Sequence, residues 1–271
     1  MNAFALEARM GSVVAAEIYL NGALLSDKQP GQMASQSLAI QHEVLPGRNQ
    51  ILAIVTAGGI PPQAAPRLAP DVDPADCFVE LYLDRETVKD LGDRYQVTND
   101  PLDERRWRPA EEGGPLSLPH RIVLEFEAPG LFLPPVWTRA TAVQPEAVRG
   151  QVAAALEDLR RLLEARDFPA FQVRMRLRNE DMARAYPLSG SAAERAVRDS
   201  STLAEEMGAP GAKIPPVDPS GLVIRTFADG RIIDPRAGDG HPALRIVAPG
   251  ADPVFLSVSF SLIEGRLSPV R

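Results

Sequence analysis

The sequence contains a single cysteine, Cys77, in 271 residues. One thiol excludes an internal disulfide framework and a zinc cluster built from several cysteines. Cys77 begins an apolar run after the stretch Asp-Pro-Ala-Asp, so we expect a buried and unreactive thiol. A chain that needs no disulfide is compatible with a reducing compartment.

Long hydrophobic runs are also missing. No apolar stretch approaches the roughly 18 residues that a membrane-spanning helix requires. The first twenty residues lack a basic start, and Glu7 and Glu17 interrupt their apolar pattern, so we do not expect a signal peptide. These absences predict a cytoplasmic protein that does not insert into a membrane.

Lysine is scarce, and positive charge is scarce in the first half. Only 3 of the 29 basic residues are lysine, which we interpret as a composition bias of the genome. The net charge is −7: residues 1–140 hold 12 basic and 19 acidic residues, and the remainder holds 17 of each. An acidic half disfavours nucleic acid and anionic membrane as partners and favours a protein with a basic surface. Solubility alone would also explain this charge.

Motifs for metal and cofactor chemistry are absent. The three histidines, His42, His120 and His241, form no pair at metal-ligand spacing. The sequence has no phosphate-binding loop, no dinucleotide-binding glycine motif and no nucleophile elbow. We therefore expect neither a metal nor a cofactor.

Proline and glycine are plentiful, with 26 and 20 residues, and they lie between short apolar runs. Asn21-Gly22 predicts a hairpin turn, and residues 121–130 (RIVLEFEAPG) alternate as a half-buried strand does. His42 falls in another expected strand. Residues 89–119 are polar and proline-rich, which predicts a long loop or a pair of loops. The pattern indicates a β-sandwich domain over residues 1–135.

The pattern changes after an expected linker at residues 136–144. Residues 145–167 carry leucines and valines at helical spacing, and residues 191–208 predict a weaker helix. Residues 171–178 fit either a strand or a helix, and we favour the helix. The last fifty residues predict strands, including a hairpin at Asp229-Gly230 and one long strand near residues 254–262. Residues 145–271 are therefore expected to be an α+β domain, with helices packed on a curved antiparallel sheet.

Both halves resemble known folds. Residues 18–22 (IYLNG) and 45–52 (LPGRNQIL) resemble the turns of jelly-roll or galactose-binding-like β-sandwiches. The C-terminal half resembles the cystatin-like NTF2 superfamily, in which a long first helix and two shorter helices pack on a curved sheet. That superfamily includes isomerases, dehydratases, immunity proteins and binding modules, so the resemblance leaves activity open.

An NTF2-like enzyme would place its acid–base groups in the cavity between helices and sheet. Asp181 and Tyr186 on the second helix, and His241 in the Asp-Gly-His-Pro connection, are the candidates. The alternatives are a solvated aspartate, a half-buried tyrosine and an ordinary loop histidine.

Two further groups are candidate ligand-binding residues. Arg174 and Arg178 lie one helical turn apart and could hold an anion, although a solvated helix face explains them equally. Trp107, in the predicted loop Arg-Arg-Trp-Arg, could stack on a sugar. It could also pack its own loop down or stack with the neighbouring arginines.

The sequence favours a non-catalytic binding protein with a protein partner, in an immunity- or effector-associated role. The first alternative is a lyase or isomerase that uses the C-terminal cavity, and the second is a carbohydrate-binding module in the N-terminal half. The ligand and the oligomeric state stay open.

Overall fold

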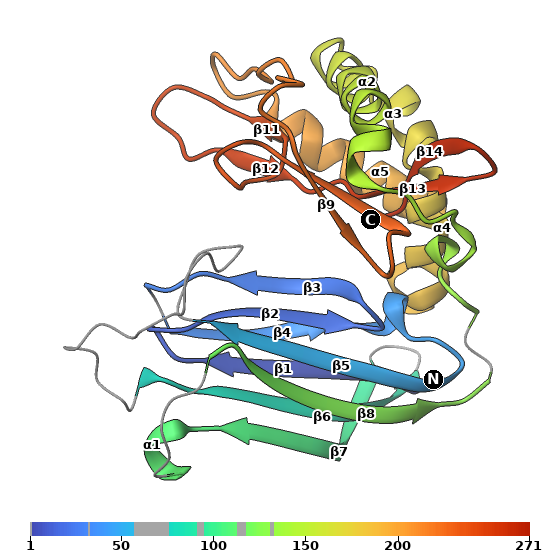
Figure 1. Cartoon of the computed structure of the whole chain (residues 1–271). Coiled ribbons are helices and arrows are strands. Elements are labelled where there is room, and N and C mark those ends of the chain that lie inside the picture. Colours follow the sequence, from blue (N-terminus) through green and yellow to red (C-terminus); the bar gives the residue numbers. More distant parts are fainter. Residues whose placement is uncertain (1, 32, 57–75, 91–94, 113–117, 131–132) are drawn as a thin grey trace. The chain divides into compact units, whose positions relative to one another are not determined.

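The computed structural model describes residues 2–31, 33–56, 76–90, 95–112, 118–130 and 133–271. The chain divides into two compact units, Met1–Pro134 (unit 1) and Pro135–Arg271 (unit 2). Figure 1 shows unit 1 as β-structure and the four longer helices in unit 2. None of the described helices is long and apolar enough to cross a membrane.

The described residues of unit 1 form two antiparallel sheets of four strands each. One sheet has the order β4 (Ala34–Ala39), β1 (Asn2–Met10), β6 (Val79–Asp90) and β7 (Tyr95–Trp107). The other has the order β3 (Ala23–Lys28), β2 (Ala15–Leu20), β5 (Gly47–Thr56) and β8 (His120–Ala128). The turn between β2 and β3 is Asn21-Gly22, at φ 53° and 81°, as the sequence predicts.

The two sheets contribute to one hydrophobic cluster. Alternate residues of β8, Ile122, Leu124 and Phe126, are buried in it. They meet side chains of the other sheet, as Phe4 does with its ring centroid 4.8 Å from that of Phe126. Cys77 lies in the same cluster and is 2% exposed, which confirms the expected buried thiol.

Two expectations for unit 1 are wrong, and one strand was not predicted. Residues 89–119 are neither one long loop nor a pair of loops in their described part, because residues 95–107 form β7 and Pro109–Glu112 forms the short helix α1. His42 lies in a 3-10 helix, η1 (Gln41–Glu43), and not in a strand. The strand that was not predicted lies in the first ten residues, where β1 pairs with both β4 and β6.

The helices of unit 2 follow the sequence pattern closely. α2 (Pro145–Glu164) buries valines and leucines at helical spacing and has proline in its first turn. The ambiguous residues 171–178 are helical, in α3 (Phe168–Arg174) and α4 (Arg176–Ala185). α5 (Ala192–Glu206) starts with a capping box between Ser191 and Glu194. The short 3-10 helix η4 (Pro187–Ser189) connects α4 and α5.

The strands of unit 2 form two sheets. The larger has the order β14 (Arg266–Pro269), β13 (Phe260–Ile263), β10 (Ile232–Arg236) and β9 (Val223–Phe227). The smaller consists of β11 (Leu244–Ile246) and β12 (Val254–Leu256). The expected long strand at residues 254–262 is therefore wrong, because the chain leaves one sheet after Leu256 and enters the other at Phe260.

Residues 136–144, expected as a linker, belong to unit 2. They begin with a 3-10 helix, η3 (Val136–Arg139). The amide of Thr141 donates to the carbonyl of Leu262 at 2.9 Å, and that of Val143 donates to Gly230 at 3.0 Å. These bonds hold the segment against β13 and the β9–β10 turn.

Candidate functional site

Asp181 is a buried residue of unit 2 whose side chain makes two contacts. It lies on α4, is 7% exposed, and its Oδ2 accepts a hydrogen bond of 2.7 Å from the amide of Val136. Its other oxygen forms an ion pair with Arg184. The carboxylate thus holds the first residue of η3, because an amide at a helix start has no partner within the helix.

Tyr186 and His241 lie elsewhere in the unit. Tyr186 caps the C-terminus of α4, five residues after Asp181, so the two side chains project about 140° apart around the helix axis. His241 is exposed and stacks on Phe255 of β12, with ring centroids 4.5 Å apart. Figure 1 shows β12 and α4 at opposite ends of unit 2. The structure therefore does not bring the three candidate catalytic residues together.

Arg174 and Arg178 do not form an anion clamp. Arg174 belongs to α3 and its Nε lies 2.8 Å from Asp158. Arg178 belongs to α4 and contacts Asp199 at 2.7 Å. Each guanidinium already has a carboxylate partner, and the two lie on different helices.

Trp107 does not present its ring to solvent. It ends β7, is 4% exposed and belongs to the hydrophobic cluster of unit 1. Its ring stacks on that of His120, with centroids 5.0 Å apart. A tryptophan that stacks on a sugar needs one ring face open to solvent, and the ring of Trp107 is buried. The sugar contact expected from the sequence therefore has no geometric support.

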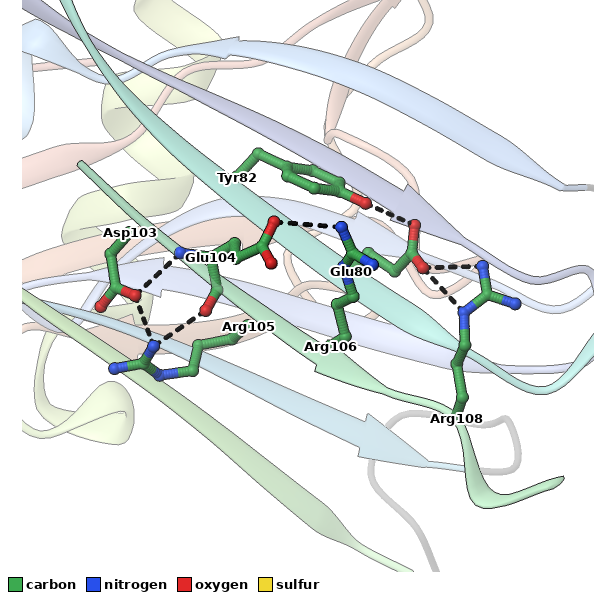
Figure 2. A network of polar contacts seen from close by, with 7 residues as sticks. All are labelled: Glu80, Tyr82, Asp103, Glu104, Arg105, Arg106 and Arg108. Atoms are coloured by element: carbon green, nitrogen blue, oxygen red, sulfur yellow. Dashed lines mark hydrogen bonds and ion pairs between the residues drawn. The ribbon is translucent and has the colours of Figure 1, made fainter. Parts of the chain in front are cut away.

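Charged side chains instead gather on the outer face of β6 and β7 (Figure 2). The carboxylate of Glu80 accepts hydrogen bonds from Tyr82 Oη at 2.9 Å and from Arg108 Nε at 2.7 Å. Arg106 contacts Glu104 at 3.1 Å. Arg9 of β1 and Arg106 lie over the ring of Tyr82, at 5.1 and 5.6 Å from its centroid.

The network shifts the titration of its two central groups. Burial raises the pKa of Glu80, but hydrogen bonds from Arg108 and Tyr82 outweigh it, so the pKa lies below the ordinary value. Burial, followed by the hydrogen bond to Glu80, raises the pKa of Tyr82. Because these groups partner one another, the network joins β1, β6 and β7.

The part of β7 beyond this network differs from every other described strand of unit 1. From Gln96 to Leu102 each side chain is exposed, although successive side chains point to opposite faces. We call residues 96–102 the exposed edge segment. It includes Val97 at 54% and Leu102 at 37% exposure, and no described strand pairs with its outer side.

Sequence reasoning missed this segment because a strand exposed on both faces has no polar–apolar alternation. The run Tyr-Gln-Val-Thr at residues 95–98 has high β propensity and was the available signal. The dipeptide Asp100-Pro101 argued against a strand here, because proline cannot donate a hydrogen bond to a neighbouring strand. Proline is nevertheless tolerated on edge strands.

Within the residues that the structure describes, no group of three histidine, cysteine or acidic side chains is placed to hold a metal. Comparison of this chain with protein-family profiles, curated proteins and solved structures finds no significant match.

Proposed function

We propose that this chain is a non-catalytic interaction protein and that the exposed edge segment of unit 1 pairs with a protein of basic surface. The observation that carries the proposal is the exposure of both faces of residues 96–102. An edge strand with unpaired backbone groups is a template for a further strand. Val97, 54% exposed, would supply an apolar contact.

Charge supports the nature of the partner. Residues 1–134 hold 11 basic and 19 acidic residues, a net charge of −8. Such a field accelerates association with a basic protein and repels an acidic one. Asp100 lies in the exposed edge segment, so its charge would be at the contact.

The architecture that we propose for this role is a β-sandwich domain followed by an α+β domain. The hydrophobic cluster shared by the two sheets of unit 1 supports the first part. The long helix α2, followed by shorter helices, supports an NTF2-like second part. The separate β11–β12 sheet departs from a single curved sheet and weighs against that resemblance.

The test identifies a partner by affinity purification and then measures its affinity as a purified protein. The double variant Val97→Lys, Asp100→Lys should weaken binding at least about tenfold, because it removes the apolar contact and reverses the local charge. Glu127→Lys on the exposed edge of β8 is the control for charge reversal and should bind within about twofold of wild type. A partner that binds all three proteins equally, or that carries an acidic surface, would contradict the proposal.

A further inference from the structure

We propose that a pocket in unit 2 binds a small organic oxyanion, a phosphate or carboxylate group carried on an apolar body. The pocket has a volume of about 580 Å³, within the range of small-molecule sites. It is formed by η3, the first turn of α4 and the β13–β14 hairpin. This site is independent of the protein contact proposed for unit 1.

The pocket is positively charged. Arg139, Arg176 and Arg266 line it, with Glu264 as the only acidic residue. Its net charge is therefore +2, on a chain whose net charge is −7. A cationic concavity on an acidic protein attracts an anion that the rest of the surface repels.

The side chains of two of these arginines have no partner among the residues that the structure describes. Several arginines elsewhere in unit 2 contact carboxylates, as Arg160 does with Glu157 and Arg245 does with Asp239, and others, such as Arg149 and Arg166, donate to backbone carbonyls. Arg176 contacts Glu180 at 2.7 Å. The guanidinium groups of Arg139 and Arg266, by contrast, make no hydrogen bond or ion pair with any described residue, and both side chains line this pocket. Their guanidinium donors are available to an oxyanion, which an arginine fork binds by two parallel hydrogen bonds.

The remaining lining indicates what carries the anion. Ser268 adds a hydroxyl, and Val136, Leu177 and Ile263 add apolar surface. Glu264 opposes a polyanion, so one phosphate or carboxylate matches the charge better than a nucleic acid does. The turn at Glu264-Gly265, with φ of 50° and 76°, connects β13 directly to Arg266, the first residue of β14. It therefore fixes the backbone position from which the Arg266 side chain extends.

The experiment is calorimetric titration of the whole chain with phenyl phosphate and with benzoate, and with benzyl alcohol as the neutral analogue. We expect one or both anions to bind at one site, and the better ligand to show whether phosphate or carboxylate is preferred. Arg139→Gln and Arg266→Gln should each weaken that binding about tenfold, the cost of one charge-assisted contact. Added salt should weaken it as well.

Arg174→Gln is the matched control, because it removes the same charge from an exposed arginine of unit 2 that does not line the pocket. Its affinity should stay within twofold of wild type. Equal weakening by Arg174→Gln would overturn the proposal, because it would show attraction to general charge. Equal binding of benzyl alcohol, or no binding of either anion at millimolar concentration, would overturn it too.

Discussion

Glu80 shows how this chain keeps a charge in a nearly buried position. The residue is 5% exposed, where an unpaired carboxylate would be costly. Its oxygens instead accept hydrogen bonds from Tyr82 and Arg108, and Arg108 also covers the ring of Phe78 at 4.6 Å. The side chain therefore connects the start of β6 to the end of β7.

Replacing this carboxylate should destabilise unit 1. Glu80→Gln is expected to lower the free energy of unfolding by about 1–2 kcal/mol at pH 7, since charge-assisted hydrogen bonds become neutral ones. Urea denaturation measures the change. Glu104→Gln is the control: that side chain is 57% exposed, and its loss should cost less than about 0.5 kcal/mol.

The difference between wild type and Glu80→Gln should depend on pH. The pKa of Glu80 is lower in the folded state than its ordinary value, so its ionisation stabilises the fold above the unfolded-chain pKa, about 4.3. That contribution disappears as the pH falls through the folded-state pKa. A difference that stays constant into this acidic range would contradict the assigned role.

At the scale of elements, close packing of the chain at one glycine gives a sharp prediction. Gly11 follows β1, and its amide donates to the carbonyl of Phe78 at 2.9 Å. A β-carbon at Gly11 would overlap the backbone carbonyl of Asp76, which a side-chain rotation cannot relieve. Gly11→Ala should therefore lower the free energy of unfolding by about 3 kcal/mol or more.

Gly150 is the matched control for that substitution. It lies on the exposed side of α2, and nothing stands within 4 Å of the position of an added β-carbon. Gly150→Ala should raise the free energy of unfolding by about 0.5–1 kcal/mol, because alanine is the better helix former. If Gly11→Ala and Gly150→Ala both raised the free energy of unfolding, the result would contradict the packing that we describe around Gly11.

The elements also show how far the sequence could predict this fold. α2 and the alternating strand β8 were predictable because each buries one face against a core, which fixes the spacing of its apolar residues. β7 was not, because the exposed edge segment buries neither face. The interruption at residues 257–259 was missed for another reason. Val258, between β12 and β13 in the sequence, is buried, and apolar residues of the two strands are buried or partly buried. The alternation of apolar and polar residues therefore continues through the position where the chain changes from one sheet to the other.

The candidate site was less predictable than the fold. Asp181 is as buried as expected for an acid–base residue, but its hydrogen bond to Val136 depends on a contact 45 residues away in sequence. Arg139 and Arg266, which line the pocket, lie far apart in the sequence. Arg139 falls in the segment that was expected to be a linker. Only the tertiary structure brings such residues to one cavity.

For the whole molecule, the boundary at residue 135 can be tested with fragments. Each unit has its own hydrophobic cluster, so residues 135–271 should unfold cooperatively when expressed alone. A fragment of residues 145–271 lacks the hydrogen bonds of Val136, Thr141 and Val143. It should be less stable by about 3 kcal/mol, at about 1 kcal/mol for each bond. Thermal and urea unfolding measure the stability of the two fragments. Equal free energies of unfolding for the two fragments would contradict the assignment of residues 135–144 to unit 2.

The two units also differ in charge. Unit 1 has a net charge of −8 and unit 2, with 18 basic and 17 acidic residues, has +1. The proposed ligands follow this division: a basic protein for the exposed edge segment and a small oxyanion for the pocket. Salt should therefore weaken both contacts, while substitutions in one unit should leave the other contact unchanged.

The lone thiol has a practical consequence. Cys77 lies inside the cluster of unit 1, and burial raises its pKa, so a thiol reagent can reach a reactive thiolate only when that unit opens. Because the chain has one cysteine, its alkylation rate reports the opening of unit 1 without a signal from unit 2. The alkylation rate of Cys77, measured by mass spectrometry, therefore reports how often unit 1 opens, even in an unpurified mixture.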